Sequence, residues 1–151
     1  MSRRKGRIIA FQALYSWDVT KSSIDDLLTF SWLQKDSDIQ AGIEEAEPEG
    51  NVKEERTFAS LIISGTISHI DEIDKRIESH LSASWSMDRI SRVALAILRI
   101  SVYEIIFQKD SESRIVIDEA VNIAKDYDSD DSYKFINAVL DKIGKDEAAK
   151  S

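Results

Sequence analysis

The chain has 151 residues, of which 42% are hydrophobic and 32% charged, and it contains no cysteine. The lack of cysteine excludes disulfide scaffolds, zinc knuckles and thiol nucleophiles, and only five glycines and one proline argue against a turn-rich all-β fold. The formal net charge of −8 argues against a protein that coats nucleic acid or a lipid surface through its overall field. Any anion-binding site must therefore be local.

Apolar residues recur at steps of three and four along most of the chain, which is the helical period. The pattern predicts an all-α fold of about seven helices in two packed three-helix subdomains. We predict helices at residues 4–17, 24–34, 53–66, 67–81, 88–107, 116–127 and 132–145. The third and fourth could form one rod, because only Gly65 separates them. Start signals are Ser23, Ser86, and Asp131 or Ser132.

We expect a single domain over residues 1–151, with a flexible acidic loop at residues 36–52 and a flexible tail at 146–151. The loop is rich in acidic residues and holds the only proline, Pro48. No apolar stretch approaches the roughly 18 residues that span a bilayer, and no cleavage site follows the basic start. We therefore expect an unprocessed, soluble cytoplasmic protein that does not bind a membrane.

Four basic residues precede the first acid, Asp18, and they are Arg3, Arg4, Lys5 and Arg7. Positive charge at a helix N-terminus opposes the macrodipole by about 0.3–1 kcal/mol per exposed charge, so folding alone does not require it. On a helical projection the three arginines fall within an arc of about 100°, which Phe11 and Tyr15 continue. Guanidinium groups beside aromatic rings suit single-stranded RNA. The alternative is an ordinary solubilising terminus.

Signatures of common enzymes are absent from the sequence, including glycine-rich phosphate loops, nucleophile elbows and zinc-protease motifs. His69 and His80 are expected on one helix face three turns apart, too far to share a metal ion. The acidic run at 126–131 does not match a calcium loop, since glycine and the bidentate glutamate are missing at their positions. We expect no catalysis, no metal and no cofactor.

Two polar side chains in the predicted helices have distinct roles. Glu104 projects among apolar residues of its helix, where a buried carboxylate most often anchors hydrogen bonds. Asn137 projects roughly 130° from the centre of the apolar face of the last helix. Asn137 can therefore face a ligand, although an exposed asparagine is often simply solvated.

Five segments, taken together and in order, carry a family resemblance. They run from Arg3-Arg4-Lys5-Gly6-Arg7 to Tyr15, from Phe58 to Asp74, from Ala96-Ile97-Leu98-Arg99 to Glu104, from Val116-Ile117-Asp118-Glu119-Ala120 to Lys125, and from Ser132 to Asp141. In these segments the chain resembles the NusB family of transcription antitermination factors (N-utilization substance B).

The resemblance implies an all-helical fold of two three-helix subdomains, without catalysis. It implies binding of the boxA element of nascent ribosomal RNA, jointly with the small-subunit ribosomal protein that acts as N-utilization substance E, in an RNA polymerase antitermination complex. Carried over by motif, the RNA-binding residues are Arg3, Arg4, Lys5, Arg7, Gln12, Tyr15, Asp131, Ser132, Phe135 and Asn137. Ala94 and Leu95 replace a charged pair of many relatives, at the expected contact with the ribosomal protein.

Two other classes of function stay open. One is a helical module that binds only protein, its basic terminus being incidental. The other is a fragment of an RNA-modifying enzyme, since a similar helical domain is fused to a methyltransferase in some of them. The sequence has no room for that catalytic domain and no glycine-rich cofactor loop.

Overall fold

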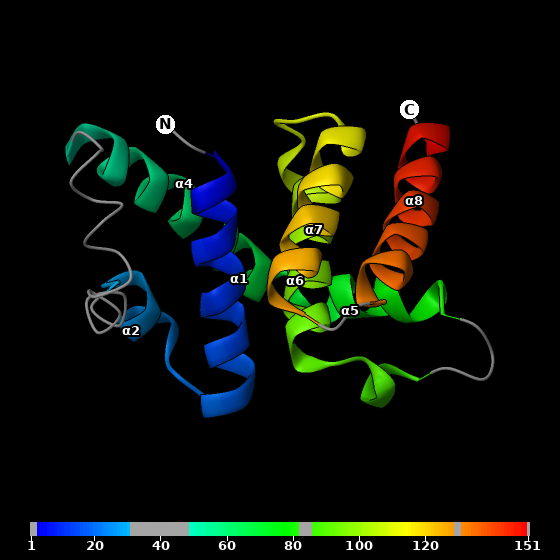
Figure 1. Ribbon diagram of the computed structural model, residues 1–151, viewed down its shortest axis with the longest axis horizontal. Coiled ribbons are helices and arrows are strands. Elements are labelled where there is room, and N and C mark those ends of the chain that lie inside the picture. Colours follow the sequence, from blue (N-terminus) through cyan, green and yellow to red (C-terminus); the bar gives the residue numbers. More distant parts are fainter. Residues whose placement is uncertain (1–2, 31–48, 82–85, 129–130, 151) are drawn as a thin grey trace. The chain divides into compact units, whose positions relative to one another are not determined.

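The computed structural model describes residues 3–30, 49–81, 86–128 and 131–150 (Figure 1). Regular structure in these ranges is entirely helical, which confirms the predicted all-α class with seven α-helices. In chain order the elements are α1 (Arg3–Thr20), α2 (Ile24–Leu28), α4 (Glu49–Ser68), α5 (Ile70–Ser79), the 3₁₀ helix η2 (Met87–Arg89), α6 (Arg92–Tyr103), the π-helical turn η3 (Glu104–Gln108), α7 (Ser113–Tyr127) and α8 (Ser132–Lys150).

The helices fall into two compact units, residues 1–64 and 65–151. The first unit holds α1, α2 and most of α4, in agreement with a three-helix subdomain. Its helices bury apolar side chains, among them Ala10, Phe11, Ala13, Leu14, Leu27, Phe58, Ala59, Ile62 and Ile63. The second unit holds the end of α4 and four further α-helices, one more than the prediction allowed.

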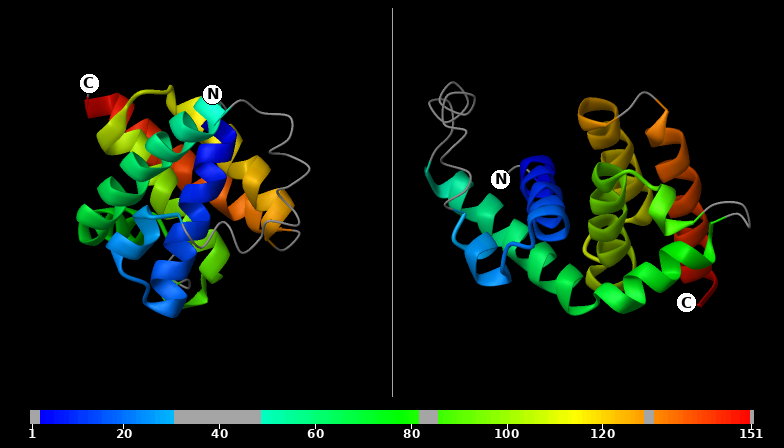
Figure 2. Two further views of the ribbon diagram at one scale, coloured as in Figure 1. Left: turned by 90° about the vertical axis from the view of Figure 1, so that its left-hand side faces the viewer. Right: turned by 90° about the horizontal axis from the view of Figure 1, so that it is seen from below.

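Helix α6 is the central element of the second unit. It contacts α5, α7 and α8, and every residue from Ala94 to Val102 is buried. A helix with apolar residues on all sides belongs in a core, as the sequence of this segment predicts. Helices α7 and α8 lie side by side (Figure 2), so each covers part of the unit with its apolar face.

The predicted helix at 88–107 is divided into η2 and a longer helix in which α6 continues directly into η3, so this prediction was wrong in detail. The segment opens with η2, and α6 begins after Ser91 rather than after Ser86. Ser91 Oγ accepts a hydrogen bond from the Ala94 amide at 3.0 Å and donates to Asp128 Oδ2 at 2.9 Å. The cap on Ala94 is a local contact, but the bond to Asp128, which follows α7, is a tertiary contact that the sequence of this segment does not show.

The two ends of α2 have different causes. Ser23 caps α2 as predicted, with the Asp26 amide 3.1 Å from its Oγ, but the helix ends at Leu28. Phe30 adopts a left-handed φ of 57°, which a continuing helix does not allow. Residues 31–34 of the predicted helix lie outside the described residues.

The third and fourth predicted helices are separate, so the alternative of one continuous rod is wrong, but the boundary between them lies four residues after Gly65. His69, with φ −112°, separates α4 from α5. Gly65 lies inside α4, where a Cβ atom would overlap the ring of Tyr103. This glycine therefore permits close packing and does not end a helix.

Two helices extend beyond the predicted limits. Helix α4 begins at Glu49, inside the predicted loop 36–52, and the part of that loop before residue 49 lies outside the described residues. Helix α8 continues to Lys150, through most of the expected tail at 146–151. Tertiary contacts explain the extension, because Arg76 Nη1 donates to Glu147 Oε1 at 2.9 Å.

The environment of Glu147 shows how the end of α8 is held. Desolvation favours the neutral carboxyl, but the hydrogen bond and charge of Arg76, with Lys150 and Lys109, outweigh it and lower the pKa of Glu147 below 4.5. His80 Nε2 lies 2.6 Å from Asp146 Oδ2, which links the end of α5 to the same turn. These contacts stabilise a turn that helix propensity alone would leave frayed.

Candidate nucleic-acid interface

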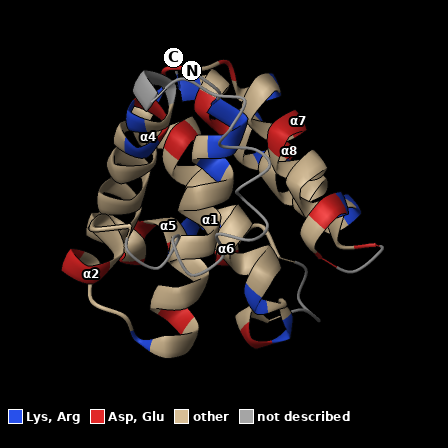
Figure 3. Cartoon of the chain, turned by 60° about the vertical axis from the view of Figure 1, so that its left-hand side comes forward, with Lys and Arg blue, Asp and Glu red and all other residues tan. Residues whose placement is uncertain are grey.

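The first turn of α1 carries no acidic residue, and its basic residues gather at the N-terminal end of the helix (Figure 3). Arg3 and Arg4 are exposed, Lys5 is half-buried, and Arg7 is only 4% exposed. The predicted cluster of four surface cations is therefore two exposed arginines beside a partly covered lysine. Arg7 is a buried residue, because α4 covers this face of α1 in the first unit.

Phe58 of α4 lies beneath two of these arginines. The Cζ atoms of Arg3 and Arg7 are 5.4 and 5.6 Å from the centroid of the Phe58 ring. Both distances are within the roughly 6 Å range of a cation–π interaction. The sequence gives no signal that Phe58 lies beside these arginines, since the contact joins helices about fifty residues apart in the sequence.

Further along α1, one of the two aromatic residues is accessible and the other is buried. Tyr15 is 37% exposed and Gln12 is half-buried, so both are accessible. Phe11 is 3% exposed and belongs to the core. The expected arc of cations above two aromatic side chains therefore retains only one accessible ring, Tyr15.

The start of α8 supplies the second set of predicted residues. Asp131 and Asn137 are exposed, whereas Ser132 and Phe135 are half-buried. The buried face of this helix consists of Ile136, Val139, Leu140, Ile143 and Gly144. Asn137 lies off that face, as predicted. This set belongs to the second unit, and the α1 residues belong to the first.

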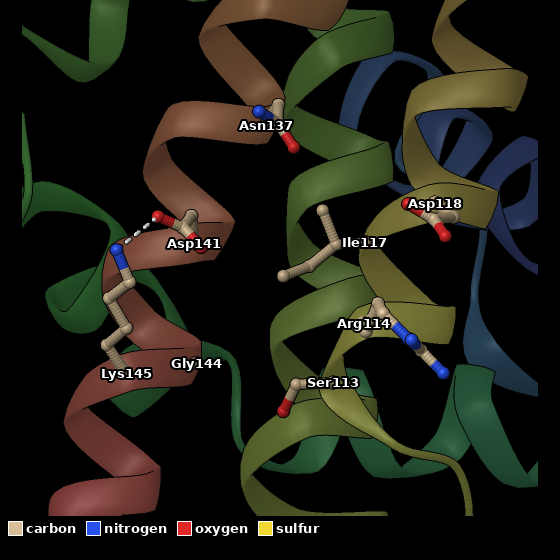
Figure 4. A pocket seen from close by; sticks show the side chains of 8 residues that line it. All are labelled: Ser113, Arg114, Ile117, Asp118, Asn137, Asp141, Gly144 and Lys145. Atoms are coloured by element: carbon tan, nitrogen blue, oxygen red, sulfur yellow. Dashed lines mark ion pairs between the residues drawn. The ribbon is translucent and has the colours of Figure 1, made fainter.

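Asn137 also lines a groove of about 290 Å³ between α7 and α8 (Figure 4). Ile117 points from α7 toward α8 and Gly144 faces it, so the floor is apolar. Asp141 and Lys145 form an ion pair of 3.0 Å on the α8 side. The remaining lining residues are Ser113, Arg114 and Asp118, all on α7. Helical periodicity places Asn137 off the apolar face of its helix, but it does not show which helix lies beside it.

Ala94 and Leu95, the expected contact with the ribosomal protein, are 2% and 3% exposed. Neither side chain presents a surface to a partner, because α6 is the central helix of its unit. The replacement of a charged pair by two apolar residues is consistent with this burial.

The remaining polar residues that sequence analysis selected have structural contacts. Glu104 is 2% exposed in η3, as expected for a buried carboxylate. His69 stacks on Phe107 with ring centroids 4.0 Å apart and an interplanar angle of 14°. Among the described residues, no group of three or more histidine or acidic side chains could hold a metal ion. No helix in the described ranges has the length and apolar character needed to cross a membrane.

The described part of the chain is all-helical, its first turn is cationic, and a groove with an apolar floor and charged rim lies beside its last helix. These features define a helical protein with a local site for an anionic ligand. The model of the NusB family matches residues 4–145. The transcription antitermination protein NusB of Treponema denticola is 50% identical over 143 residues, which cover 95% of this chain and 96% of the relative. The chain therefore belongs to the NusB family, as the sequence resemblance indicated.

Solved structures agree with this membership. NusB from T. maritima matches with a TM-score of 0.75 and 32% identity over 96% of this chain and 92% of that one. A chain in the crystal structure of the antitermination factors NusB and NusE in complex with dsRNA matches with a TM-score of 0.74 and 29% identity. That alignment covers 95% of this chain and 96% of the other.

Proposed function

We propose that this chain is a non-catalytic RNA-binding adaptor in transcription antitermination. It binds boxA RNA together with the ribosomal protein that acts as NusE, within an antitermination complex on RNA polymerase. The observation that carries the proposal is the first turn of α1, where Arg3 and Arg4 are exposed and no acid is present. The structure of a related chain with NusE and dsRNA supports the same assignment.

The energetics of the first turn favour a ligand. Exposed cations at a helix N-terminus cost about 0.3–1 kcal/mol each against the macrodipole. An RNA phosphate bound there offsets this unfavourable energy, because it brings negative charge to the positive end of the helix. Arg3 and Arg4 offer planar guanidinium forks to phosphate oxygens, and Lys5 offers a point charge.

The small number of accessible cations limits the affinity of the chain alone. Single-stranded RNA binding has a salt slope of about −0.7 per phosphate neutralised. Arg3, Arg4 and Lys5 could therefore account for a slope of only about −2. A chain with net charge −8 adds no favourable long-range field. Tight binding then requires a protein partner that contributes further RNA contacts.

The residues at the start of α8 form the proposed second contact, with base edges. Asn137 is exposed, and its amide can pair with a base through one donor and one acceptor. Phe135 is half-buried and offers part of a ring for stacking, while Asp131 and Ser132 provide acceptors near the helix start. Tyr15 and Gln12 complete the proposed set on α1.

A filter-binding titration with boxA single-stranded RNA, at one fixed salt concentration, tests the proposal. Scrambled RNA of the same length serves as the control, and each titration is run with and without the NusE ribosomal protein. We expect the tightest binding for boxA RNA with the partner present. Equal affinity with and without the partner would refute the adaptor. Binding of the partner alone, without RNA affinity, would favour a module that only binds protein.

A further inference from the structure

We propose that Phe58 positions the Arg3 guanidinium for an RNA phosphate, and that buried Arg7 supports the packing of Phe58 against α1 without contacting RNA. This inference rests on the proposed function and adds a positioning residue on α4 to the cations of α1. It also divides the basic cluster into residues that reach solvent and one that does not.

The geometry places two guanidinium groups on one ring. Arg3 and Arg7 are four residues apart and therefore lie on the same face of α1. Their Cζ atoms are at nearly equal distances from the Phe58 centroid, 5.4 and 5.6 Å. Arg3 is exposed at the end of the helix, whereas Arg7 is 4% exposed. Only Arg3 of this pair can meet a phosphate without a rearrangement.

Gly6 sets the separation between α1 and the ring. A Cβ atom at this position would lie 2.6 Å from Phe58 Cδ2 and 3.2 Å from the carbonyl oxygen of Glu55. Any larger residue would push α4 away or turn the ring. The glycine therefore allows the ring to lie under both arginines, and this explains its place inside a helix, where it is otherwise unfavourable.

The interior of the first unit holds a buried acid as well as Arg7. Arg7 and Glu55 are its two buried charged side chains among the described residues, each 4% exposed. Glu55 lies one helical turn before Phe58 on α4. A buried cation is tolerated when an opposite charge is buried with it, so Arg7 is suited to a structural role.

The expected benefit of the Phe58 ring is that it orders the Arg3 side chain before RNA binds. An arginine side chain that makes no such contact loses conformational entropy when it binds a phosphate. A guanidinium that already lies on an aromatic face has lost part of that freedom before the phosphate binds. Phe58 thus raises RNA affinity without adding charge.

The test compares Phe58→Leu with Phe58→Tyr, and uses Ile62→Val as a matched control. Ile62 is fully buried on the same helix, one turn away, and its truncation loosens the core without removing a ring. We expect Phe58→Leu to weaken binding of boxA RNA by about twofold to tenfold, the range for ordering one side chain. Phe58→Tyr and Ile62→Val should bind like the wild-type chain.

Salt dependence separates positioning from charge. Phe58→Leu retains every cation, so its salt slope should equal that of the wild type. Arg3→Ala should lower affinity and reduce the slope by about 0.7. Arg7→Ala should lower the melting temperature and leave the slope unchanged. A slope reduced by Arg7→Ala, as for Arg3→Ala, would overturn the supporting role of Arg7.

The Nε–Hε resonances of the wild-type arginines provide a readout that does not depend on RNA. Ring currents of Phe58 should shift the Arg3 and Arg7 signals upfield, and Phe58→Tyr should preserve these shifts. An Arg3 signal at its random-coil position would overturn the positioning role, whatever the stability of the variants. Equal RNA affinity of Phe58→Leu and wild type would overturn it too. Absence of RNA binding by the wild type, with shifted arginine signals, would instead refute the proposed function on which this inference rests.

Discussion

Arg99 of α6 and Asp74 of α5 form a two-point ion pair in the second unit. Arg99 Nε donates to Asp74 Oδ1 and Nη2 donates to Oδ2, both at 2.9 Å. The arginine is 8% exposed, and the carboxylate side chain is 29% exposed. Parallel hydrogen bonds of this kind fix orientation as well as distance, so the pair sets how α5 lies against the central helix.

Replacing this carboxylate should destabilise the fold more than replacing a surface one. Asp74→Ala removes two charge-assisted hydrogen bonds from a buried guanidinium, and we expect a loss of about 2–3 kcal/mol in the free energy of unfolding. Urea denaturation measures it. Asp141→Ala is the control, because its pair with Lys145 is exposed and should contribute less than about 0.5 kcal/mol. Equal losses would show that the pair of Arg99 and Asp74 contributes no more to stability than the exposed pair.

The exposed cation Arg4 should contribute to RNA binding through charge. Arg4→Ala should lower affinity for boxA and scrambled RNA alike and reduce the salt slope by about 0.7. Lys75→Ala, at an exposed position of α5, changes the net charge by the same amount. If both variants weaken binding equally, overall charge rather than the first turn of α1 is responsible.

Asn137 should act on sequence discrimination instead. Its side chain is exposed on α8, so Asn137→Ala should melt like the wild type. If the amide reads a base, affinity for boxA RNA should fall by about 1–3 kcal/mol, with little change for scrambled RNA and no change in salt slope. Titrations with both RNAs check this. Normal melting with unaltered discrimination would rule out the base contact.

Glu147 should make stability depend on acid pH. Its pKa in the folded chain lies below the ordinary 4.5, so the ionised carboxylate stabilises the fold. This contribution is complete above the pKa of the unfolded chain and is lost as the pH falls through the lower folded value. The stability difference between wild type and Glu147→Gln should therefore be constant near neutral pH and shrink below about pH 4.5. A difference that grows on acidification would contradict the sign.

Gly65 should resist replacement by a better helix former. Alanine gains about 1 kcal/mol over glycine in a helix, but here its Cβ would overlap the Tyr103 ring. We expect Gly65→Ala to lower the melting temperature measured by circular dichroism. Gly144→Ala is the matched control, because its nearest neighbour would be Ser113 Cβ at an ordinary 3.4 Å. If both alanines raise the melting temperature, the ring moves aside at little cost.

Local sequence signals determined the helical class and several helix ends. Ser23 caps α2 through its own side chain, and the apolar face of α8 is buried, as its helical period predicts. Both features could be predicted because they depend only on residues within a few turns. The charge of the first turn, and with it the hypothesis of RNA binding, also came from adjacent residues. These properties need no knowledge of distant contacts.

Tertiary structure decided the rest, because the deciding contacts join distant segments. Arg7 looks equivalent to Arg3 in the sequence, yet α4 buries one and leaves the other exposed. Ser91 rather than Ser86 begins α6, and it is tied to Asp128 of the turn after α7. Helix α8 extends to Lys150 with Glu147 held by Arg76 of α5. Periodicity shows which side chains share a helix face, but only packing shows which neighbour covers that face.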